Sequence, residues 1–353
     1  MNTSERIYIG SYKGQSTYCL HVCNYDSQNG SITKLNSCEI DNSSYLCLSP
    51  DRRCLYTVIE QDNYKGRPGG GIAAFGVEND GKLRFLNDSY TEGEHPCHLS
   101  VSADGKTLYA ANYSGGSTIY FDLLATGEIG EKKVFVNHRD FGAASNAFER
   151  RQESPHAHYV QPVTVGGIST IWVCDLGLDA VLILDEAGKE LTRFQAPAGF
   201  GPRHLAFHPT LPYAYLLGEL ACAVITLEYS FDTALKLGSY LPVSVFGGFA
   251  ENTTSAAIRV SPDCKHLLVS NRVHGEEGTI SILNLYKGIA AGVKSLVPSG
   301  GCWPRDFAFT PAGDRVLVAN EHSDRVSVFD WCEGSLTHTG IDFHVQKPAC
   351  ILM

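Results

Sequence analysis

The chain has 353 residues, a formal net charge of −10 at pH 7, 35 glycines and 10% aromatic residues. The acidic balance argues against nucleic acid or an anionic membrane as the main partner, because both would require a basic face. Abundant glycine and aromatic residues are typical of many short strands joined by tight turns. A small anionic substrate is compatible with this charge where a few arginines gather locally.

Twelve cysteines are scattered along the chain, several of them inside apolar runs. They form no C-x-x-C pair and have no regular spacing, so we expect buried, reduced thiols rather than a secreted disulfide framework. Disulfides or one reactive cysteine are the alternatives. The first residues contain no apolar signal core, and no run of 18 apolar residues occurs. The sequence therefore predicts a cytoplasmic protein that does not associate with membranes.

One unit recurs along the chain. It begins at a proline or small residue, continues through an alternating strand, a turn and a second apolar strand, and ends at a polar residue. Successive units begin 44 to 59 residues apart, a period typical of propeller blades rather than of helical solenoids. The openings are Ser44, Pro96, Pro155, Pro202, Ser255, Pro304 and Pro348.

In chain order, residues 6–11, 18–25 and 31–40 are three predicted strands that lack an opening strand of their own. Residues 347–353 resemble the other openings and then the chain ends. We expect both termini to complete one four-stranded blade, which leaves no unpaired major edge. The predicted fold is all-β: a seven-bladed β-propeller with four antiparallel strands per blade, closed by the C-terminal strand, in a single domain of residues 1–353.

Two segments depart from the repeat. Residues 61–71 are too rich in glycine for a strand; we interpret them as a long turn, since no helix follows that would support a phosphate-binding loop. Residues 138–153 form the longest non-repeating insertion and predict either a lid or a mobile loop. Between them, Asp104-Gly105 predicts a tight hairpin turn.

The first two strands of a blade are antiparallel, so the start of the first lies beside the end of the second. The polar residues at these positions should therefore converge on one mouth of the channel. Those at strand starts are His156, His158, Arg203, His204, Arg305 and Asp306, and those at strand ends are Asn112, Asp175, Glu219, Asn271, Arg272, Asn320 and Glu321.

Arginines in this set point to a ligand. Arg203, Arg272 and Arg305 would crowd three positive charges around one channel, which is costly unless Glu219 and an anionic ligand offset them. The aspartates and asparagines have a plain structural alternative, because such residues commonly bond turn backbones and neighbouring blades. This alternative applies to Asn112, Asp175, Asp306 and Asn320.

His156 and His158 flank a single alanine, so on a strand they point to the same side. They could supply two metal ligands, but no third histidine, cysteine or carboxylate has a recognisable spacing, and we expect no metal. Acid–base or substrate contact by at least one of them is the favoured role, with structural hydrogen bonding as the alternative. A serine nucleophile is disfavoured, since no G-x-S-x-G elbow occurs.

Several motifs in order together resemble the seven-bladed propeller lactonase family. They are Ser154-Pro-His-Ala-His158 followed by Asp175-Leu-Gly-Leu-Asp179, Gly199-Phe-Gly-Pro-Arg-His-Leu-Ala-Phe-His-Pro209 with Glu219, Ser270-Asn-Arg272, and Pro304-Arg-Asp-Phe307 with Ala319-Asn320. The resemblance covers nearly the whole chain and is strongest over residues 95–329. It implies opening or formation of a lactone without a metal or cofactor, most specifically hydrolysis of 6-phosphogluconolactone in carbohydrate metabolism.

The resemblance also implies residue roles. The functional set of the related muconate cyclases falls on His156, Arg203, Glu219 and Arg272, with His156 as general base and the arginines binding the substrate anion or the oxyanion. The alternatives are a muconate-type lactonising cycloisomerase, a lactonase that acts on another substrate, and a non-catalytic propeller that binds a metabolite or protein. We expect a monomer or weak homo-oligomer. The further predicted substrate-binding residues are His158, His204, Arg305, Asn112, Asn271 and Asn320.

Overall fold

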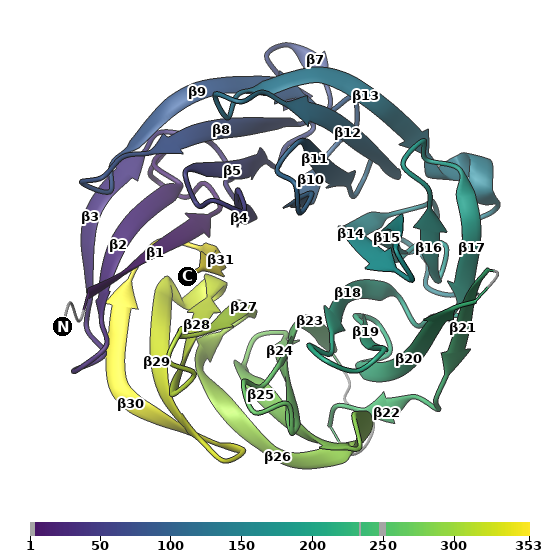
Figure 1. Cartoon of the computed structure of the whole chain (residues 1–353). Coiled ribbons are helices and arrows are strands. Elements are labelled where there is room, and N and C mark those ends of the chain that lie inside the picture. The colour runs from purple at the N-terminus through teal and green to yellow at the C-terminus, as the bar shows by residue number, and fades with distance from the viewer. Residues whose placement is uncertain (1–3, 233, 247–251) are drawn as a thin grey trace. The chain divides into compact units, whose positions relative to one another are not determined.

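A computed structural model describes residues 4–232, 234–246 and 252–353, and the chain in it is almost entirely β structure (Figure 1). The only helices in the described part are two short 3₁₀ turns, η1 (His138–Phe141) and η2 (Glu321–Ser323). The predicted single domain of residues 1–353 stays a prediction. The chain divides into two compact units, which are Met1–Ser37, His204–Tyr229 and Lys236–Met353 for unit 1 and Cys38–Arg203 and Ser230–Leu235 for unit 2.

Unit 2 contains three four-stranded antiparallel sheets whose strands follow chain order. The first consists of β4 (Leu46–Leu48), β5 (Cys54–Ile59), β8 (Gly71–Val77) and β9 (Leu83–Tyr90). The second consists of β10 (Pro96–Val101), β11 (Thr107–Asn112), β12 (Ser117–Leu123) and β13 (Ile129–Asn137). The third consists of β14 (Ala157–Val165), β15 (Ile168–Asp175), β16 (Ala180–Leu184) and β17 (Glu190–Gln195).

Unit 1 contains three further sheets of the same plan. One combines β1 (Ser4–Ser11), β2 (Leu20–Asp26) and β3 (Ile32–Cys38) with β31 (Pro348–Leu352). The next consists of β23 (Thr253–Val260), β24 (His266–Val273), β25 (Glu277–Tyr286) and β26 (Ile289–Cys302). The last consists of β27 (Pro304–Phe309), β28 (Arg315–Asn320), β29 (Arg325–Cys332) and β30 (Ser335–His344).

The seventh sheet consists of β18 (Pro202–Phe207), β19 (Tyr213–Gly218), β20 (Ala223–Phe231) and β21 (Leu235–Ser239). A short fifth strand, β22 (Val243–Ser244), also pairs with β20. Apart from the small β6–β7 ribbon, the described residues form seven sheets built on four antiparallel strands, which confirms the predicted all-β class of seven blades.

Burial explains why these segments are strands. Every residue of the second strands β5 and β11 is buried, as expected for strands covered on both faces. The fourth strands β13 and β17 are largely exposed or half-buried, because each ends its sheet. The core lies between neighbouring sheets. In unit 2, for example, the buried Tyr56 and Leu108 belong to one cluster, and the Tyr56 hydroxyl donates to Gly127 O at 3.0 Å.

A hydroxyl and a carboxylate shape the turn between the first two strands of several sheets. Ser102 Oγ donates to Asp104 Oδ1 at 2.6 Å, and the amide of Gly105, at φ +72°, donates to Ser102 O. This confirms the Asp104-Gly105 turn, in which only glycine adopts the left-handed backbone without strain. The hydroxyl bond lowers the pKa of Asp104. Ser49 with Asp51 and Ser261 with Asp263 repeat the same 2.6 Å bond.

In four of the sheets, strand register confirms that the blade opening lies beside the polar end of the next strand. Pro304 is the Cα partner of Asn320, and the other three sheets repeat the arrangement. The further partners are Pro96 with Asn112, Ala157 with Asp175 and Ser255 with Asn271.

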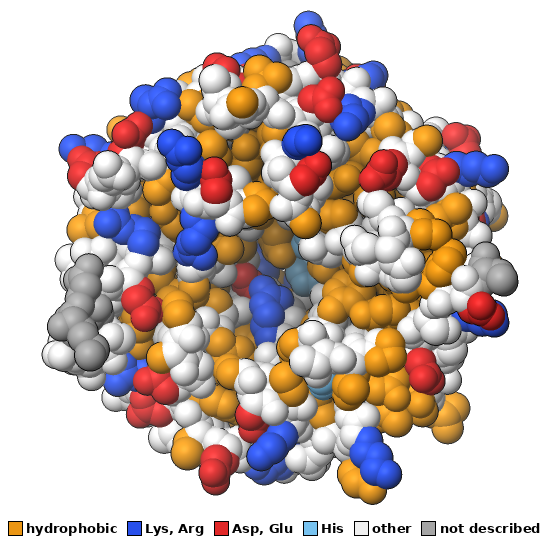
Figure 2. All heavy atoms as spheres, in the orientation of Figure 1, with side chains coloured by type: hydrophobic (Ala, Val, Ile, Leu, Met, Phe, Trp, Pro, Cys, Tyr) orange, Lys and Arg blue, Asp and Glu red, His pale blue; other side chains and the backbone are white. Residues whose placement is uncertain are grey.

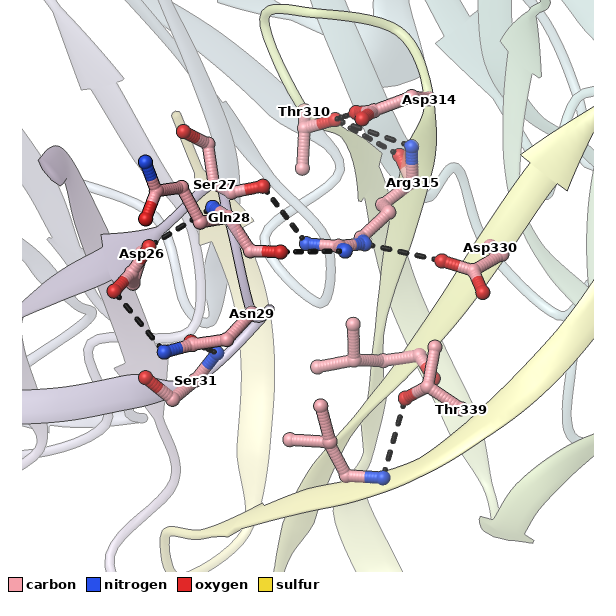
Figure 3. Close-up of polar contacts among 12 residues, drawn as sticks. Asp26, Ser27, Gln28, Asn29, Ser31, Thr310, Asp314, Arg315, Asp330 and Thr339 are labelled. Carbon is pink, nitrogen blue, oxygen red and sulfur yellow. Dashed lines mark hydrogen bonds and ion pairs between the residues drawn. The ribbon is translucent and has the colours of Figure 1, made fainter. Parts of the chain in front are cut away.

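Pairing of the termini within unit 1 is also confirmed. β31 pairs with β1 in antiparallel register, with Ile351 opposite Ile9, and the two strands lie side by side in Figure 1. Arg315, at the start of β28, strengthens this end of the unit (Figure 3). Its guanidinium donates to the backbone carbonyls of Ser27 and Gln28 in the β2–β3 turn and to Asp330. The predicted composite blade is therefore tied to the neighbouring sheet by side chains as well.

The glycine-rich segment 61–71 differs from its prediction. It contains a two-residue ribbon of β6 (Asn63–Tyr64) and β7 (Arg67–Pro68), so the prediction of a plain turn is wrong for these four residues. Three of its glycines, Gly69, Gly70 and Gly71, are closely packed. A Cβ on Gly70 would come within 2.1 Å of Pro96 Cδ.

Both ends of the insertion 138–153 are fastened to the third sheet of unit 2. The buried His138 lies 2.7 Å from Asp175 through Nδ1 and Oδ2. Near the other end, Gln152 Nε2 donates to Leu176 O and to Asp179 Oδ1, both at 2.8 Å. The sequence predicts either a lid or a mobile loop for this insertion. If it is a lid, only the residues between His138 and Gln152 are able to move.

Candidate functional site

The first candidate group is a histidine cluster in unit 2, made of Tyr113, Glu153, His156 and His158. Tyr113 follows the end of β11, and its ring stacks on His156 with centroids 4.5 Å apart and planes 15° apart. The edge of His158 meets the same tyrosine at 5.4 Å. Both histidines thus contact one ring, with His156 directly before β14 and His158 within it.

Hydrogen bonds fix the tautomer of His156. Its Nδ1 lies 3.0 Å from the backbone oxygen of Tyr113, and a carbonyl can only accept, so Nδ1 carries the proton. The other nitrogen, Nε2, lies 3.3 Å from Glu153 Oε1 and 3.5 Å from Ser154 Oγ. In the neutral ring, Nε2 is therefore the atom that can accept a proton.

Asp175 holds the backbone beneath His156. Its Oδ1 accepts from the amides of His156 at 2.8 Å and Leu178 at 2.9 Å, while its Oδ2 contacts His138. Asp175 is fully buried. This supports the structural alternative for Asp175, whose role is to position the strand that carries the histidine.

His158 is buried to a similar extent to His156 and lies beside a cysteine thiol. Its Nδ1 lies 3.8 Å from Cys97 Sγ, and that thiol also lies 3.6 Å from Ala157 O. His156 Nε2 has a carboxylate oxygen 3.3 Å away in a ring whose tautomer is fixed, so it is placed for proton transfer.

The second candidate group is an arginine cluster in unit 1, made of Tyr12, Glu219, Arg272, Trp303, Arg305, Glu321 and His322. Its centre is an ion pair between Arg272, on β24, and Glu219, which follows β19. Arg272 Nη2 lies 3.0 Å from Glu219 Oε1, and the two side chains are 5% and 4% exposed. The guanidinium also donates to Ser255 O at 3.3 Å. Its buried Nε has no hydrogen-bond partner within the described residues.

Trp303 links Arg272 to the next blade opening. The guanidinium carbon lies 5.0 Å from the centre of the Trp303 ring, within the range of a cation–π contact. His322 stacks on the tryptophan at 4.8 Å with planes 10° apart, and His274 meets its edge at 4.8 Å. Trp303 adopts φ +61°, which is strained for a bulky residue, so its ring is held in place by its backbone as well as by its neighbours.

Arg305 stands at the other end of the cluster, two residues beyond Trp303. Its Nη1 lies 3.9 Å from Glu321 Oε2, and Glu321 in turn lies 3.8 Å from His322 Nε2. Its guanidinium carbon lies 4.8 Å from the Tyr12 ring centre, and Nη2 donates to the Tyr12 hydroxyl. A continuous chain of contacts therefore runs within unit 1 from Glu219 to Tyr12 and includes the predicted Arg272 and Arg305.

Arg203 and His204 are consecutive residues of β18 and are both buried. Their predicted roles, binding the substrate anion for Arg203 and contacting the substrate for His204, stay predictions. The histidine and arginine clusters lie in different units of the chain. That their residues act together on one substrate also stays a prediction.

The three asparagines are structural in their observed contacts. None exposes side-chain surface, and their amides bind neighbouring strands and turns. Asn112 Nδ2 donates to Thr91 O and Ser117 Oγ, Asn271 Nδ2 to Thr279 Oγ1 and Ser281 Oγ, and Asn320 Nδ2 to Ser299 O and Ser327 Oγ. The predicted substrate contact of these asparagines stays a prediction. Asp306 likewise pairs with Arg259 at 2.8 Å.

Sequence reasoning missed the aromatic partners. Tyr113 stands next to the predicted Asn112, and Trp303 stands two residues before the predicted Arg305. Their positions next to polar residues at strand ends and starts could have identified them as candidates. Tyr12 follows β1, and only the pairing of the termini with the rest of unit 1 relates it to Arg305.

Three further observations concern surface charge, metal binding and membrane-spanning helices. Figure 2 shows lysine and arginine side chains interspersed with acidic ones over the face drawn. In residues 4–232, 234–246 and 252–353, no three His, Cys, Asp or Glu side chains gather in a way that could hold a metal ion. No helix in the part that the structure describes is long and apolar enough to cross a membrane.

The chain is similar to known proteins over nearly its whole length. The family described as "Lactonase, 7-bladed beta-propeller" matches residues 6–353. The chain is 30% identical to a 6-phosphogluconolactonase of Bacillus subtilis, over 98% of this chain and 97% of the relative. It is 29% identical to a 6-phosphogluconolactonase of Formosa agariphila, over 92% and 91%.

A solved structure agrees with these relatives. The periplasmic gluconolactonase of Pseudomonas aeruginosa aligns with a TM-score of 0.83 and 28% identity, over 98% of both chains. The repeat of seven four-stranded sheets, the pairing of the termini and the full-length family match agree. The chain belongs to the seven-bladed β-propeller lactonase family.

Proposed function

We propose that this protein hydrolyses a sugar-acid lactone, with 6-phosphogluconolactone as the first candidate substrate. Two relatives of nearly full-length coverage bear the name 6-phosphogluconolactonase, and a similar solved structure is a gluconolactonase. The observation that carries the proposal is the fixed tautomer of His156, which leaves Nε2 free to accept a proton beside Glu153.

In the proposed reaction, His156 Nε2 takes a proton from water as the water oxygen attacks the lactone carbonyl carbon. The carbonyl electron pair moves to oxygen and gives a tetrahedral oxyanion. When the pair returns, the ring C–O bond breaks, and the protonated His156 gives its proton to the leaving alkoxide. The product is an open hydroxy acid that ionises at neutral pH, and the histidine ends as it began.

In this proposal, the arginine cluster supplies positive charge that stabilises the substrate anion and the tetrahedral oxyanion. Arg272 presents a planar guanidinium whose orientation is set by Glu219, Ser255 O and Trp303. A preoriented donor of this kind stabilises developing negative charge without reorganising during the reaction. We assign Arg272 and Arg203 to the substrate anion or the oxyanion, and Glu219 to orienting Arg272.

The setting of the reaction is also part of the proposal. We propose a cytoplasmic enzyme, acting as a monomer or weak homo-oligomer on a small anionic lactone. Burial raises the pKa of Cys23 to about 12 and raises that of Cys174 as well, which keeps these thiols protonated and unreactive. A thiol titration of the denatured protein without reductant should then detect all twelve cysteines.

The test is a panel of lactones assayed beside their spontaneous opening. The panel contains freshly generated 6-phosphogluconolactone, glucono-1,5-lactone and a muconolactone, with acid release followed directly. Acceleration of 6-phosphogluconolactone well beyond background supports the full proposal. Acceleration of the muconolactone alone would replace the sugar substrate by a muconate-type one. Background rates with all three lactones from folded protein would favour a non-catalytic propeller.

A further inference from the structure

The arginine cluster contains a carboxylate that the proposed reaction does not use. Glu321 begins η2, directly after Asn320 at the end of β28. Its Oε2 lies 3.9 Å from Arg305 Nη1, and the two side chains are 12% and 16% exposed. Glu321 therefore places a negative charge beside one of the arginines expected to bind an anion.

This carboxylate is poorly explained by structure alone. Within the described residues, Oε2 is buried and accepts no hydrogen bond. A buried carboxylate oxygen without a donor is costly, and a neutral glutamine of the same shape would avoid much of that cost. The other close partner, His322 Nε2, lies 3.8 Å from Oε1. What glutamate has and glutamine lacks here is its charge.

The charge acts on Arg305. Tyr12 covers the guanidinium face at 4.8 Å and accepts a hydrogen bond from it, so Arg305 is held in one place in a partly desolvated setting. In such a setting opposite charges a few ångströms apart offset one another more strongly than in water. To a ligand, Arg305 and Glu321 together present a pair without net charge, in which the N–H donors of the arginine stand beside a carboxylate.

We propose that Glu321 sets the charge preference of the substrate site. The Arg305–Glu321 pair matches an uncharged hydroxylated part of a lactone, since a hydroxyl accepts from the Arg305 N–H groups without bringing a second negative charge to Glu321. A phosphate dianion would meet the glutamate charge as well as the arginine and would gain less. This inference rests on the proposed lactonase function and deepens it, because it names Glu321 as the residue that limits selectivity for phosphorylated lactones.

The test compares kcat/KM for 6-phosphogluconolactone and glucono-1,5-lactone in the wild type and in Glu321→Gln. The variant should raise the ratio of phosphorylated to unphosphorylated kcat/KM about tenfold, chiefly through KM. The control is Asp330→Asn, which removes the same unit charge from the Arg315–Asp330 pair at the opposite end of β28. It should leave the ratio unchanged.

A second readout uses inorganic phosphate as an inhibitor of glucono-1,5-lactone hydrolysis. Phosphate should inhibit Glu321→Gln about tenfold more tightly than the wild type, and the gain should shrink with added salt. An active variant with unchanged ratio and unchanged phosphate inhibition would overturn the inference and leave the lactonase proposal standing. A wild type that accelerates neither lactone would overturn both.

Discussion

Arg272 Nη2 lies 3.0 Å from Glu219 Oε1, and neither side chain has more than 5% of its surface exposed. Two charges taken this far out of water are stable only as a pair with good geometry, and such a pair is often no more stable than apolar residues of the same volume. Stability alone therefore does not account for it. We propose that this oriented guanidinium binds an anion of the substrate or of the reaction.

The first prediction removes the charge from this pair. Glu219→Gln leaves Arg272 buried without its carboxylate and should lower the free energy of unfolding by about 3 kcal/mol, measured by denaturant titration. Hydrolysis should fall by about 10²-fold, because the guanidinium loses its orientation.

The double variant Glu219→Gln with Arg272→Met separates the two effects. It should regain most of the lost stability while hydrolysis stays low. A double variant as active as the wild type would show that the pair is purely structural.

The second prediction concerns the ring that covers Arg272. Trp303→Leu removes the cation–π contact at 5.0 Å and the stack with His322, and should lower kcat/KM about tenfold. Trp303→Phe should recover part of the loss.

Trp331→Leu is the matched control for Trp303. Trp331 packs in the core of the same sheet, against Phe309 and His266. Its replacement should lower Tm but preserve kcat/KM in the protein that remains folded. Equal losses of kcat/KM in both variants would argue against a specific role for Trp303.

The third prediction tests the junction drawn in Figure 3. Arg315→Met removes bonds to Tyr25 Oη, Ser27 O and Asp330 and should destabilise the protein by about 2 kcal/mol without changing kcat. Arg325→Met breaks a more exposed pair with Asp342 and should cost less than 1 kcal/mol. Similar costs for the two variants would mean that the junction adds little.

The fourth prediction follows from a buried histidine. Burial, with a smaller contribution from Lys34, lowers the pKa of His21 to about 4 from 6.5. The neutral ring thus contributes stability that is fully present above pH 6.5 and is lost as the pH falls toward 4, by up to about 3 kcal/mol. Between pH 6.5 and 4, the free energy of unfolding of His21→Gln should therefore fall by about 3 kcal/mol less than that of the wild type. His344→Gln, at an exposed position, should keep the wild-type slope, and an unchanged slope in both would refute the assignment.

Much of the fold could be predicted from the sequence because each blade repeats one local pattern. Pro96, Pro304 and Pro348 mark strand openings directly, and the hydrophobic alternation after them fixes which face is buried. Even the pairing of the termini follows, since the three N-terminal strands lack a partner that Pro348–Leu352 supplies.

The site was predicted less completely. His156, Arg272 and Glu219 follow from polar residues at strand ends, where side chains can reach solvent or a ligand. The same rule gave the asparagines, but it does not distinguish a side chain facing a ligand from one whose amide binds a neighbouring turn, as in Asn112. It also missed Trp303, whose role depends on a left-handed backbone and on neighbours from other strands.

Glutamine in place of His156 tests the central claim most directly, because it keeps the size and polarity of the side chain but cannot take up the proton. The measurement is the initial rate of 6-phosphogluconolactone hydrolysis, corrected for spontaneous opening, in the wild type and His156→Gln. The account predicts clear acceleration by the wild type and a loss of about 10²-fold or more in the variant. His208→Gln, in the β18–β19 turn, should retain the wild-type rate. A folded His156→Gln protein as fast as the wild type would contradict the account.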